Sequence, residues 1–223
     1  MPGVKVVERE AFDCCEALTD VECVKLEIIG NYAFGGCKSL RSINLSSSKI
    51  VEKSAFHRCE ALTNVEFGKE LERIEEKAFY CCTSLERITI PLKENMIAAD
   101  GIFQTCKKLK HVDLVEEAAL HDTIAALLLE EWKNDMDREI DAINQILPIT
   151  RADDYFDDVG GKALEIRKWI SSLLGKIARY KAQHRHLLNE AATTLQYTLP
   201  NDNVFKNVLP FLELPSFTFE GED

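Results

Sequence analysis

Eight cysteines are the residues of this chain that most readily suggest chemistry, because thiols form disulfides, bind metals and act as nucleophiles. Five recur at one position of a periodic pattern: Cys15, Cys37, Cys59, Cys82 and Cys106. If the copies of this pattern stack on one another, cysteines of neighbouring copies come within about 5–6 Å, which permits a disulfide. Five thiols in one column cannot, however, all pair. We therefore expect them, and Cys23 in a strand, to be small buried apolar residues. Cys14 and Cys81 occupy a variable position, where Cys81 is a candidate for a partly exposed thiol.

Other reactive residue types lack the spacing that catalysis or metal binding requires. No Cys-x-x-Cys pair and no histidine at ligand spacing indicates a metal site. Gly160-Gly161-Lys162 lacks the first glycine and the Ser/Thr of a phosphate-binding loop, and we interpret it as a hinge. His184 and His186 fall on different helix faces, whereas His57 and His111 are expected to face solvent. We predict no catalytic residue, no metal site, no cofactor and no enzymatic activity.

Composition excludes further classes. The 38 acidic and 27 basic side chains give a net charge of −11, which disfavours nucleic acid as a partner. No stretch approaches the ~20 apolar residues of a membrane span, and the charged segment from Lys5 to Glu10 is not the apolar core of a signal peptide. We therefore predict a cytoplasmic protein, and the cysteine content agrees with a reducing compartment.

An internal repeat organises the first half of the chain. In each copy a cysteine lies three residues after a phenylalanine, and a leucine lies three residues after the cysteine. An apolar pair then lies three and five residues after the leucine. The phenylalanines lie 22, 22, 23 and 24 residues apart and are Phe12, Phe34, Phe56, Phe79 and Phe103.

The spacing within one copy predicts a strand and a short turn. Leu-x-x-Ile-x-Ile has the two-residue period of a strand with one buried face, and Ala-Phe-x-x-Cys fits about one helical or 3₁₀ turn. Neither element can bury its own apolar side, so the copies must stack. We predict an α/β solenoid, with a short parallel strand ladder and short helical turns.

The polar residues of the predicted strands point outward and form a candidate protein-binding face. Their mixed charges suit a protein surface better than a uniformly charged ligand. The candidate residues are Thr19, Asp20, Glu22, Arg41, Ser42, Asn44, Thr63, Asn64, Glu66, Glu86, Arg87, Thr89, Lys110, His111 and Asp113.

In its repeated Ala-Phe-x-x-Cys-x-x-Leu-x-x-Ile-x-Ile segments the sequence resembles the BspA-type leucine-rich repeats. The unit of that family reads roughly Ile-Gly-x-x-Ala-Phe-x-x-Cys-x-x-Leu-x-x-Ile-x-Ile-Pro. The segment from Ile29 to Ile43 is a near match, and the resemblance covers about residues 4–115. It implies a solenoid that binds rather than catalyses, as in bacterial and protist surface adhesins. Glu52 and Glu75 replace the consensus glycine. The chain also starts inside a repeat, which a truncated gene model or a partner covering the open edge would explain.

After residue 115 the pattern becomes helical. Apolar residues at spacings of three and four predict a long helix over 116–147, ended by Pro148, and a second over 162–199 that resembles the helical tails of some protist repeat proteins. Residues 116–158 hold 13 acidic and 3 basic side chains, and residues 162–186 hold 1 acidic and 7 basic ones. This complementarity favours an antiparallel hairpin, and a seam shared between two chains is the alternative. The seam residues are Ile166, Ile170, Leu173, Ile177, Tyr180, His184, Leu187, Ala191 and Thr194.

These patterns predict three parts and a binding function. The parts are repeats over 1–115, a long-helix hairpin or coiled coil over 116–200, and a short helix with an acidic tail over 201–223. We predict a non-catalytic protein–protein interaction module whose partners are other proteins, with the helices as a docking or oligomerisation arm. A homodimer through the 162–199 helix is possible. A cell-surface or secreted adhesin and a structural spacer are the alternatives.

Overall fold

The structure, a computed structural model, describes residues 3–115, 117–149 and 161–198. The chain forms two compact units, each built from two segments. The first consists of Met1–Glu116 and Asp141–Ser171, and the second of Glu117–Ile140 and Ser172–Asp223. The segment predicted as a short helix with an acidic tail, 201–223, lies outside the described residues.

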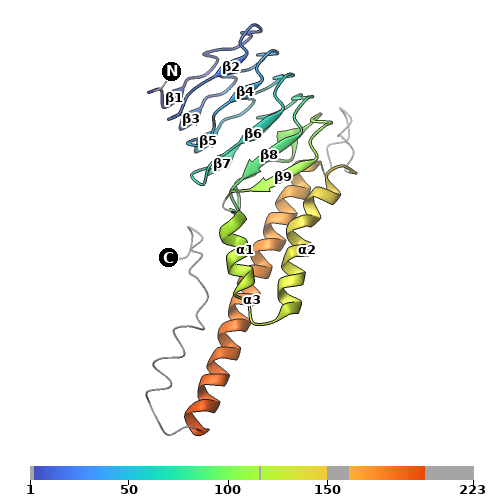
Figure 1. Ribbon diagram of the computed structural model, residues 1–223. Helices are drawn as coiled ribbons and strands as arrows, with labels where there is room; N and C mark the ends of the chain where they lie inside the picture. Colours follow the sequence, from blue (N-terminus) through green and yellow to red (C-terminus); the bar gives the residue numbers. More distant parts are fainter. Residues whose placement is uncertain (1–2, 116, 150–160, 199–223) are drawn as a thin grey trace. The chain divides into compact units, whose positions relative to one another are not determined.

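In the first unit the predicted strands form a parallel ladder in the expected register, which confirms the solenoid (Figure 1). Asp20 pairs with Ser42, and Arg87 pairs with both Asn64 and His111. A bridge between Leu45 and Phe67 connects the two parts of the series. We call this series ladder 1; its strands are β2 (Asp20–Val21), β4 (Ser42–Ile43), β6 (Asn64–Glu66), β8 (Arg87–Ile90) and β9 (His111–Leu114).

A second parallel ladder, which the sequence analysis did not predict, runs through the same repeats. It continues past its last strand through a bridge between Ile74 and Ile97. Each of its strands has two residues, the first outward and the second buried, so it lacks the longer alternation by which a strand is recognised. We call this series ladder 2; its strands are β1 (Val6–Val7), β3 (Ile28–Ile29), β5 (Ile50–Val51) and β7 (Arg73–Ile74).

The Ala-Phe-x-x-Cys segments connect ladder 2 to ladder 1 through tight turns. The predicted helical turn is formed as a 3₁₀ helix in the last copy, η1 (Asp100–Phe103). In the first four copies the residues two before and two after the phenylalanine have positive φ, because the chain reverses more sharply there than a helix allows. In all five copies the residue two after the phenylalanine has positive φ; these are Cys14, Gly36, Arg58, Cys81 and Thr105.

The phenylalanines stack in a column through the core. Ring centroids of successive copies lie 5.3, 5.5, 5.2 and 5.8 Å apart, and the ring planes are within 16° of parallel. Phe34, Phe56 and Phe79 are fully buried. Each such ring removes a large apolar area from water, so the column is a major part of the solenoid's stability.

The two glutamates that replace the consensus glycine bind the preceding copy. The Asn31 amide donates to Glu52 Oε2 at 2.9 Å, and the Lys53 amide donates to Glu75 Oε2 at 3.2 Å. Gly30 has no room for a side chain, because a Cβ would lie 2.7–2.8 Å from the backbone of the first copy. The departures from the consensus therefore add bonds between repeats.

Helix ends from the later part of the chain pack on the last repeat within the first unit. The Val112 amide of β9 donates to Asn144 Oδ1 at 2.9 Å. Lys162 is 3% exposed, and its ammonium donates to the carbonyls of Leu109 at 2.9 Å and Leu147 at 2.7 Å. Lys162, from the segment that we interpreted as a hinge, thus anchors the start of a helix to the solenoid.

The α-helices of the described residues are α1 (Glu117–Ala125), α2 (Glu130–Ile146) and α3 (Lys162–Thr198). The prediction of one long helix over 116–147 was wrong, because the chain leaves helical geometry between α1 and α2. Three successive leucines cannot share one helix face; here Leu127 is buried, whereas Leu128 and Leu129 are exposed. Glu130 and Glu131 then open α2, where acidic side chains favour a helix N-terminus.

In the second unit α2 and α3 run antiparallel within one chain, as the hairpin prediction requires. Trp132 of α2 stacks on Tyr180 of α3 with ring centroids 5.3 Å apart. The predicted seam residues of α3 are buried from Ile166 to His184 within the single chain. The alternative, a dimer through this seam, would need the same side chains to be exposed. None of the helices in the described ranges is long and apolar enough to cross a membrane.

The buried ammonium of Lys162 provides a test of the anchor. We expect Lys162→Met to lower the free energy of unfolding by about 1–3 kcal/mol, because two buried carbonyls lose their donor. Urea denaturation followed by circular dichroism measures the change. Lys168→Met, at an exposed position of α3, is the matched control and should cost less than about 0.5 kcal/mol. Equal losses in both variants would contradict the anchoring role.

Candidate functional site

The structure brings the predicted protein-binding face together on ladder 1. Register aligns its residues in columns, so that Glu66, Thr89 and Asp113 lie beside one another on β6, β8 and β9. All of the predicted face residues are exposed except Thr89 and Asp113, which are half-buried. The strands thus present one continuous polar surface, and its role in binding remains a prediction.

Several side chains of this face bind one another. Ser42 Oγ donates to Asp20 Oδ1 at 2.7 Å, and this hydroxyl holds the pKa of the Asp20 carboxyl below its usual value. The Arg87 guanidinium forms an ion pair with Asp113, which lies on the neighbouring strand. These contacts restrict the side chains before any partner arrives, which reduces the entropy lost on binding.

Charge along ladder 1 is mixed. The end formed by the first repeat carries Asp20 on β2, whereas at the end formed by the last repeats Arg87 and Lys110 stand beside Glu86 and Asp113, and Arg87 is paired with Asp113. A surface on which acidic and basic side chains hold fixed places restricts the orientation of a charged partner. Among the described residues no three His, Cys, Asp or Glu side chains come together as a metal site.

All eight cysteines carry free thiols, and four members of the repeated column have a further role. The thiols of Cys37, Cys59, Cys82 and Cys106 each donate to a phenylalanine carbonyl of the preceding repeat, at 3.0–3.2 Å. Burial raises the pKa of the Cys37 thiol to about 11 and raises that of Cys59 further. These cysteines are buried as predicted, and their hydrogen bonds, which the sequence did not reveal, join adjacent repeats.

Cys15 departs from this pattern. We expected all five column cysteines to be buried, but Cys15 is exposed, as is its neighbour Cys14. Both belong to the first repeat, where Phe12 is also half-buried rather than fully buried. The column cysteine of the first repeat is therefore exposed, whereas Cys106 of the last repeat is buried.

His57 also differs from its prediction. It was expected to face solvent, as the exposed His111 does, but it is half-buried between two tyrosines. Its ring lies 5.7 Å from the Tyr32 ring and 5.0 Å from the Tyr80 ring, between centroids. Burial, and then the nearby Arg58 charge, lower the pKa of His57. The imidazole is therefore neutral near pH 7 and belongs to an aromatic row across three turns.

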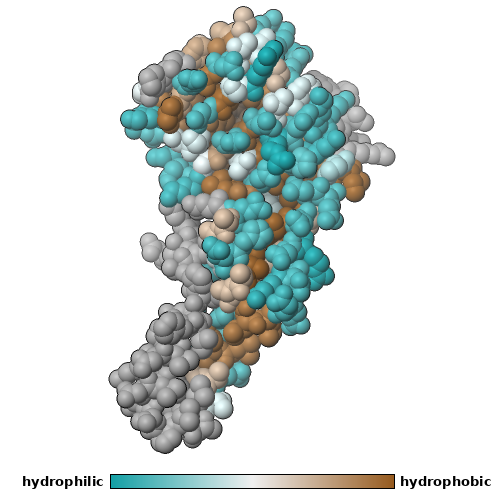
Figure 2. Space-filling model, in the orientation of Figure 1, coloured by the Kyte–Doolittle hydropathy of each residue, from teal (hydrophilic) through white to brown (hydrophobic). Residues whose placement is uncertain are grey.

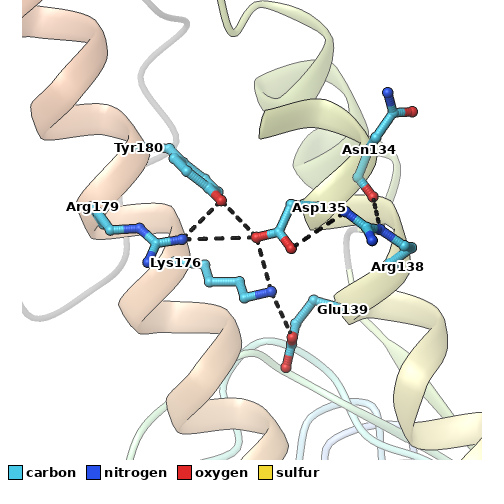
Figure 3. A network of polar contacts seen from close by, with 7 residues as sticks. All are labelled: Asn134, Asp135, Arg138, Glu139, Lys176, Arg179 and Tyr180. Carbon is cyan, nitrogen blue, oxygen red and sulfur yellow. Dashed lines mark hydrogen bonds and ion pairs between the residues drawn. The ribbon is translucent and has the colours of Figure 1, made fainter. Parts of the chain in front are cut away.

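A polar network in the second unit joins α2 to α3 (Figure 3). Lys176 lies between two carboxylates, with its Nζ 2.9 Å from both Asp135 Oδ2 and Glu139 Oε2. The Tyr180 hydroxyl donates to Asp135 at 2.6 Å. The Arg179 guanidinium donates to the Tyr180 oxygen and lies over its ring at 4.6 Å from the centroid. Acidic α2 and basic α3 are thus complementary at specific atoms.

The pKa shifts within this network favour pairing of the two helices. Hydrogen bonds from Tyr180 and then from Lys176 lower the pKa of Asp135. Burial and the Asp135 carboxylate both raise the pKa of Tyr180, so its phenol stays protonated near neutral pH. Burial alone would lower the pKa of Lys176, but Glu139 and Asp135 outweigh it and raise that pKa. Asp135, Lys176 and Tyr180 therefore keep the charge states that favour pairing.

A family model described as the BspA type leucine-rich repeat region matches residues 5–122 in six copies. A leucine-rich cell surface protein from Faecalibacterium prausnitzii A2-165 is similar in structure, with 28% identity and a TM-score of 0.45 over 51% of this chain and 30% of its own. The leucine-rich repeat protein of T. pallidum is 26% identical, with a TM-score of 0.39 over 49% of this chain and 63% of its own.

The pneumococcal vaccine antigen PcpA is 18% identical, with a TM-score of 0.37 over 51% of this chain and 28% of its own. No curated protein matches the sequence. The chain covers less than two thirds of the length of each of these solved structures.

Thiol exposure can be tested by alkylation. We expect iodoacetamide at pH 8 to modify Cys14 and Cys15 in the native protein, because both thiols are exposed. Cys37, Cys59 and Cys82 should react only after unfolding, since burial both shields them and disfavours the thiolate. Mass spectrometry of peptides with and without urea gives the modified sites. Rapid native labelling of Cys59 would contradict the thiol–carbonyl ladder.

Acid should weaken the α2–α3 network. Because the pKa of folded Asp135 lies below the value of 3.8 for a free Asp, its contribution is full above pH 3.8 and is lost as pH falls through the folded pKa. We expect Asp135→Asn to lower the free energy of unfolding at pH 7, and the difference from wild type to shrink below pH 3.8. Urea titrations across this pH range measure it. Asp141→Asn, the same change at an exposed site on the same helix, is the control at pH 7.

Proposed function

The chain belongs to the BspA-type leucine-rich repeat family, and from this premise we propose that it is a non-catalytic protein-interaction module. Its recognition surface in this proposal is the exposed face of ladder 1. The observation that carries the proposal is the alignment of charged and polar side chains in columns on strands that the stacked core holds rigid. A rigid surface binds with little loss of conformational entropy.

The charge distribution indicates the kind of partner. A protein segment that carries basic groups opposite Asp20 and Glu22, and charges of both signs opposite the last repeats, would match this face. A uniformly charged polymer would be attracted by some of these side chains and repelled by others. The partner in this proposal is therefore a protein with mixed surface charge.

The helices are proposed as a docking arm. Since α2 and α3 use their seam within one chain, the side chains left for a partner are those on the outer surface. Glu130, Glu131 and Asp137 are exposed on α2 and give that surface an acidic character. Such a surface suits a basic partner or a basic region of the same partner.

The cellular setting of this function has two candidates, a reducing compartment and the cell surface as an adhesin. The thiol–carbonyl bonds support the first, because a thiol that is oxidised to a disulfide can no longer donate to a carbonyl. A count of free thiols on protein isolated from cells under acid quench separates the two settings. Eight free thiols favour the reducing compartment, and disulfides favour the adhesin.

The ladder 1 face is tested by substitution of its basic residues. We expect the triple variant Arg41→Ala, Arg87→Ala and Lys110→Ala to weaken binding of a partner captured by the full chain at least about tenfold, because three charge contacts are lost. Affinity is measured by isothermal titration calorimetry with the purified partner at physiological salt.

The matched control carries the same change in net charge away from both ladders. Lys25→Ala, Lys38→Ala and Lys69→Ala alter exposed lysines outside the strands and should leave the affinity within about twofold. Equal affinity of the ladder 1 variant and wild type would show that the partner binds elsewhere. Failure to capture any specific partner at physiological salt would favour a structural spacer.

A further inference from the structure

Ladder 2 carries an exposed apolar row that ladder 1 lacks. The register places Val6 of β1 beside Ile28 of β3, and Ile28 beside Ile50 of β5. Val6 is 42% exposed, and the two isoleucines are half-buried with their next neighbours in the chain turned into the core. In Figure 2 brown surface lies among teal side chains in the part of the view where Figure 1 labels these strands.

Charged residues border this row on both sides. Lys5 binds Glu27 at 2.6 Å, and Lys49 lies 3.3 Å from the same carboxylate. Because of these two lysines the pKa of Glu27 is lowered, so this border is ionised at neutral pH. An apolar centre with a polar rim is the composition of a protein interface, whereas the ladder 1 face is polar throughout.

The rim has an excess of carboxylates. Arg73 at the end of the row pairs with Glu75 at 2.9 Å, and Lys5 and Lys49 share Glu27. The glutamates that remain around the row are Glu8, Glu52 and Glu72. A partner that flanks its apolar residues with Lys or Arg would therefore complement this rim.

The spacing of the row selects the form of such a partner. Neighbouring strands of a ladder lie about 4.8 Å apart, so the three aliphatic side chains span about 10 Å. Residues at i, i+4 and i+7 of an α-helix rise about 6 and 10.5 Å along its axis, at 1.5 Å per residue. An amphipathic helix laid across the strands would place its aliphatic residues within about 1.2 Å of the spacing of Val6, Ile28 and Ile50.

We propose that the β1–β3–β5 face of ladder 2 is a second interaction surface, which binds an amphipathic helix of another protein with aliphatic residues at i, i+4 and i+7 and basic residues beside them. This surface is separate from the ladder 1 face, and it does not depend on the function proposed for that face.

The probe is a capped helical peptide of about 16 residues with leucines at i, i+4 and i+7, lysines beside them and alanine elsewhere. It is titrated into the full chain labelled with ¹³C at the Ile and Val methyl groups. We expect saturable chemical-shift changes at the methyls of Val6, Ile28 and Ile50, with a Kd of about 1 mM or tighter. A peptide of the same composition with its leucines distributed around the helix should give no saturable change.

Variants identify the surface. Val6→Lys adds a charge at an exposed position of the row and should weaken the peptide about tenfold, whereas Asn64→Lys makes the same change in charge on ladder 1 and should have no effect. Replacing the lysines of the peptide by glutamates should also weaken it. The triple variant at Arg41, Arg87 and Lys110 should bind it as wild type does, which separates this surface from the proposed function.

Three outcomes would overturn the proposal. One is shifts that are confined to methyl groups outside the row. Another is equal binding of the peptide with distributed leucines. The third is a concentration-dependent shift of the Val6, Ile28 and Ile50 methyls without peptide, which would mean that a second copy of this chain occupies the face.

Discussion

The stacked column of phenylalanine rings is the constraint on which the rest of the solenoid depends. Its steps of 5.2 to 5.8 Å are close to the about 4.8 Å between paired strands, so the rings and both ladders share one translation per repeat. A thiol spans each step and donates to the carbonyl of the preceding phenylalanine. A larger residue at the cysteine position would push the repeats apart, and an apolar one would leave the carbonyl without this donor. The repeat therefore requires a small donor at that position.

The sequence predicted the parts of the structure in which one residue type recurs at one place. Five copies of Phe-x-x-Cys-x-x-Leu predicted the core, and the apolar pair after each leucine predicted ladder 1 and its outward residues. Ladder 2 was missed because its strands, such as Ile28–Ile29, are two residues long and show no alternation. Its available signal was the apolar pair at Val6–Val7, Ile28–Ile29 and Ile50–Val51, which a strand must split between outside and core.

Other features depended on neighbours that a repeat pattern does not specify. Cys15 occupies the same position of the Ala-Phe-x-x-Cys-x-x-Leu motif as Cys37, and its exposure follows from its place in the first repeat. The spacing of apolar residues predicted a helix that continues through Leu128. In the structure α1 ends before this residue, because three adjacent leucines cannot all face one side of a helix. The anchor made by Lys162 joins carbonyls at Leu109 and Leu147, contacts between distant residues that no local pattern encodes. The missed features share this dependence on distant residues.

The two ladders differ in what they can contribute to binding, because each of the first three repeats gives polar residues to ladder 1 and an outward aliphatic residue to ladder 2. Exposed charges such as those of Asp20 and Arg87 guide encounter and orientation, but each exposed pair contributes little free energy. Burial of an aliphatic group such as Ile28 stabilises a complex with little dependence on direction or salt. Since the phenylalanine column holds both surfaces on the same rigid rungs, a partner long enough to reach both would gain orientation from ladder 1 and affinity from ladder 2. A partner limited to ladder 1 would bind weakly and with a strong salt dependence.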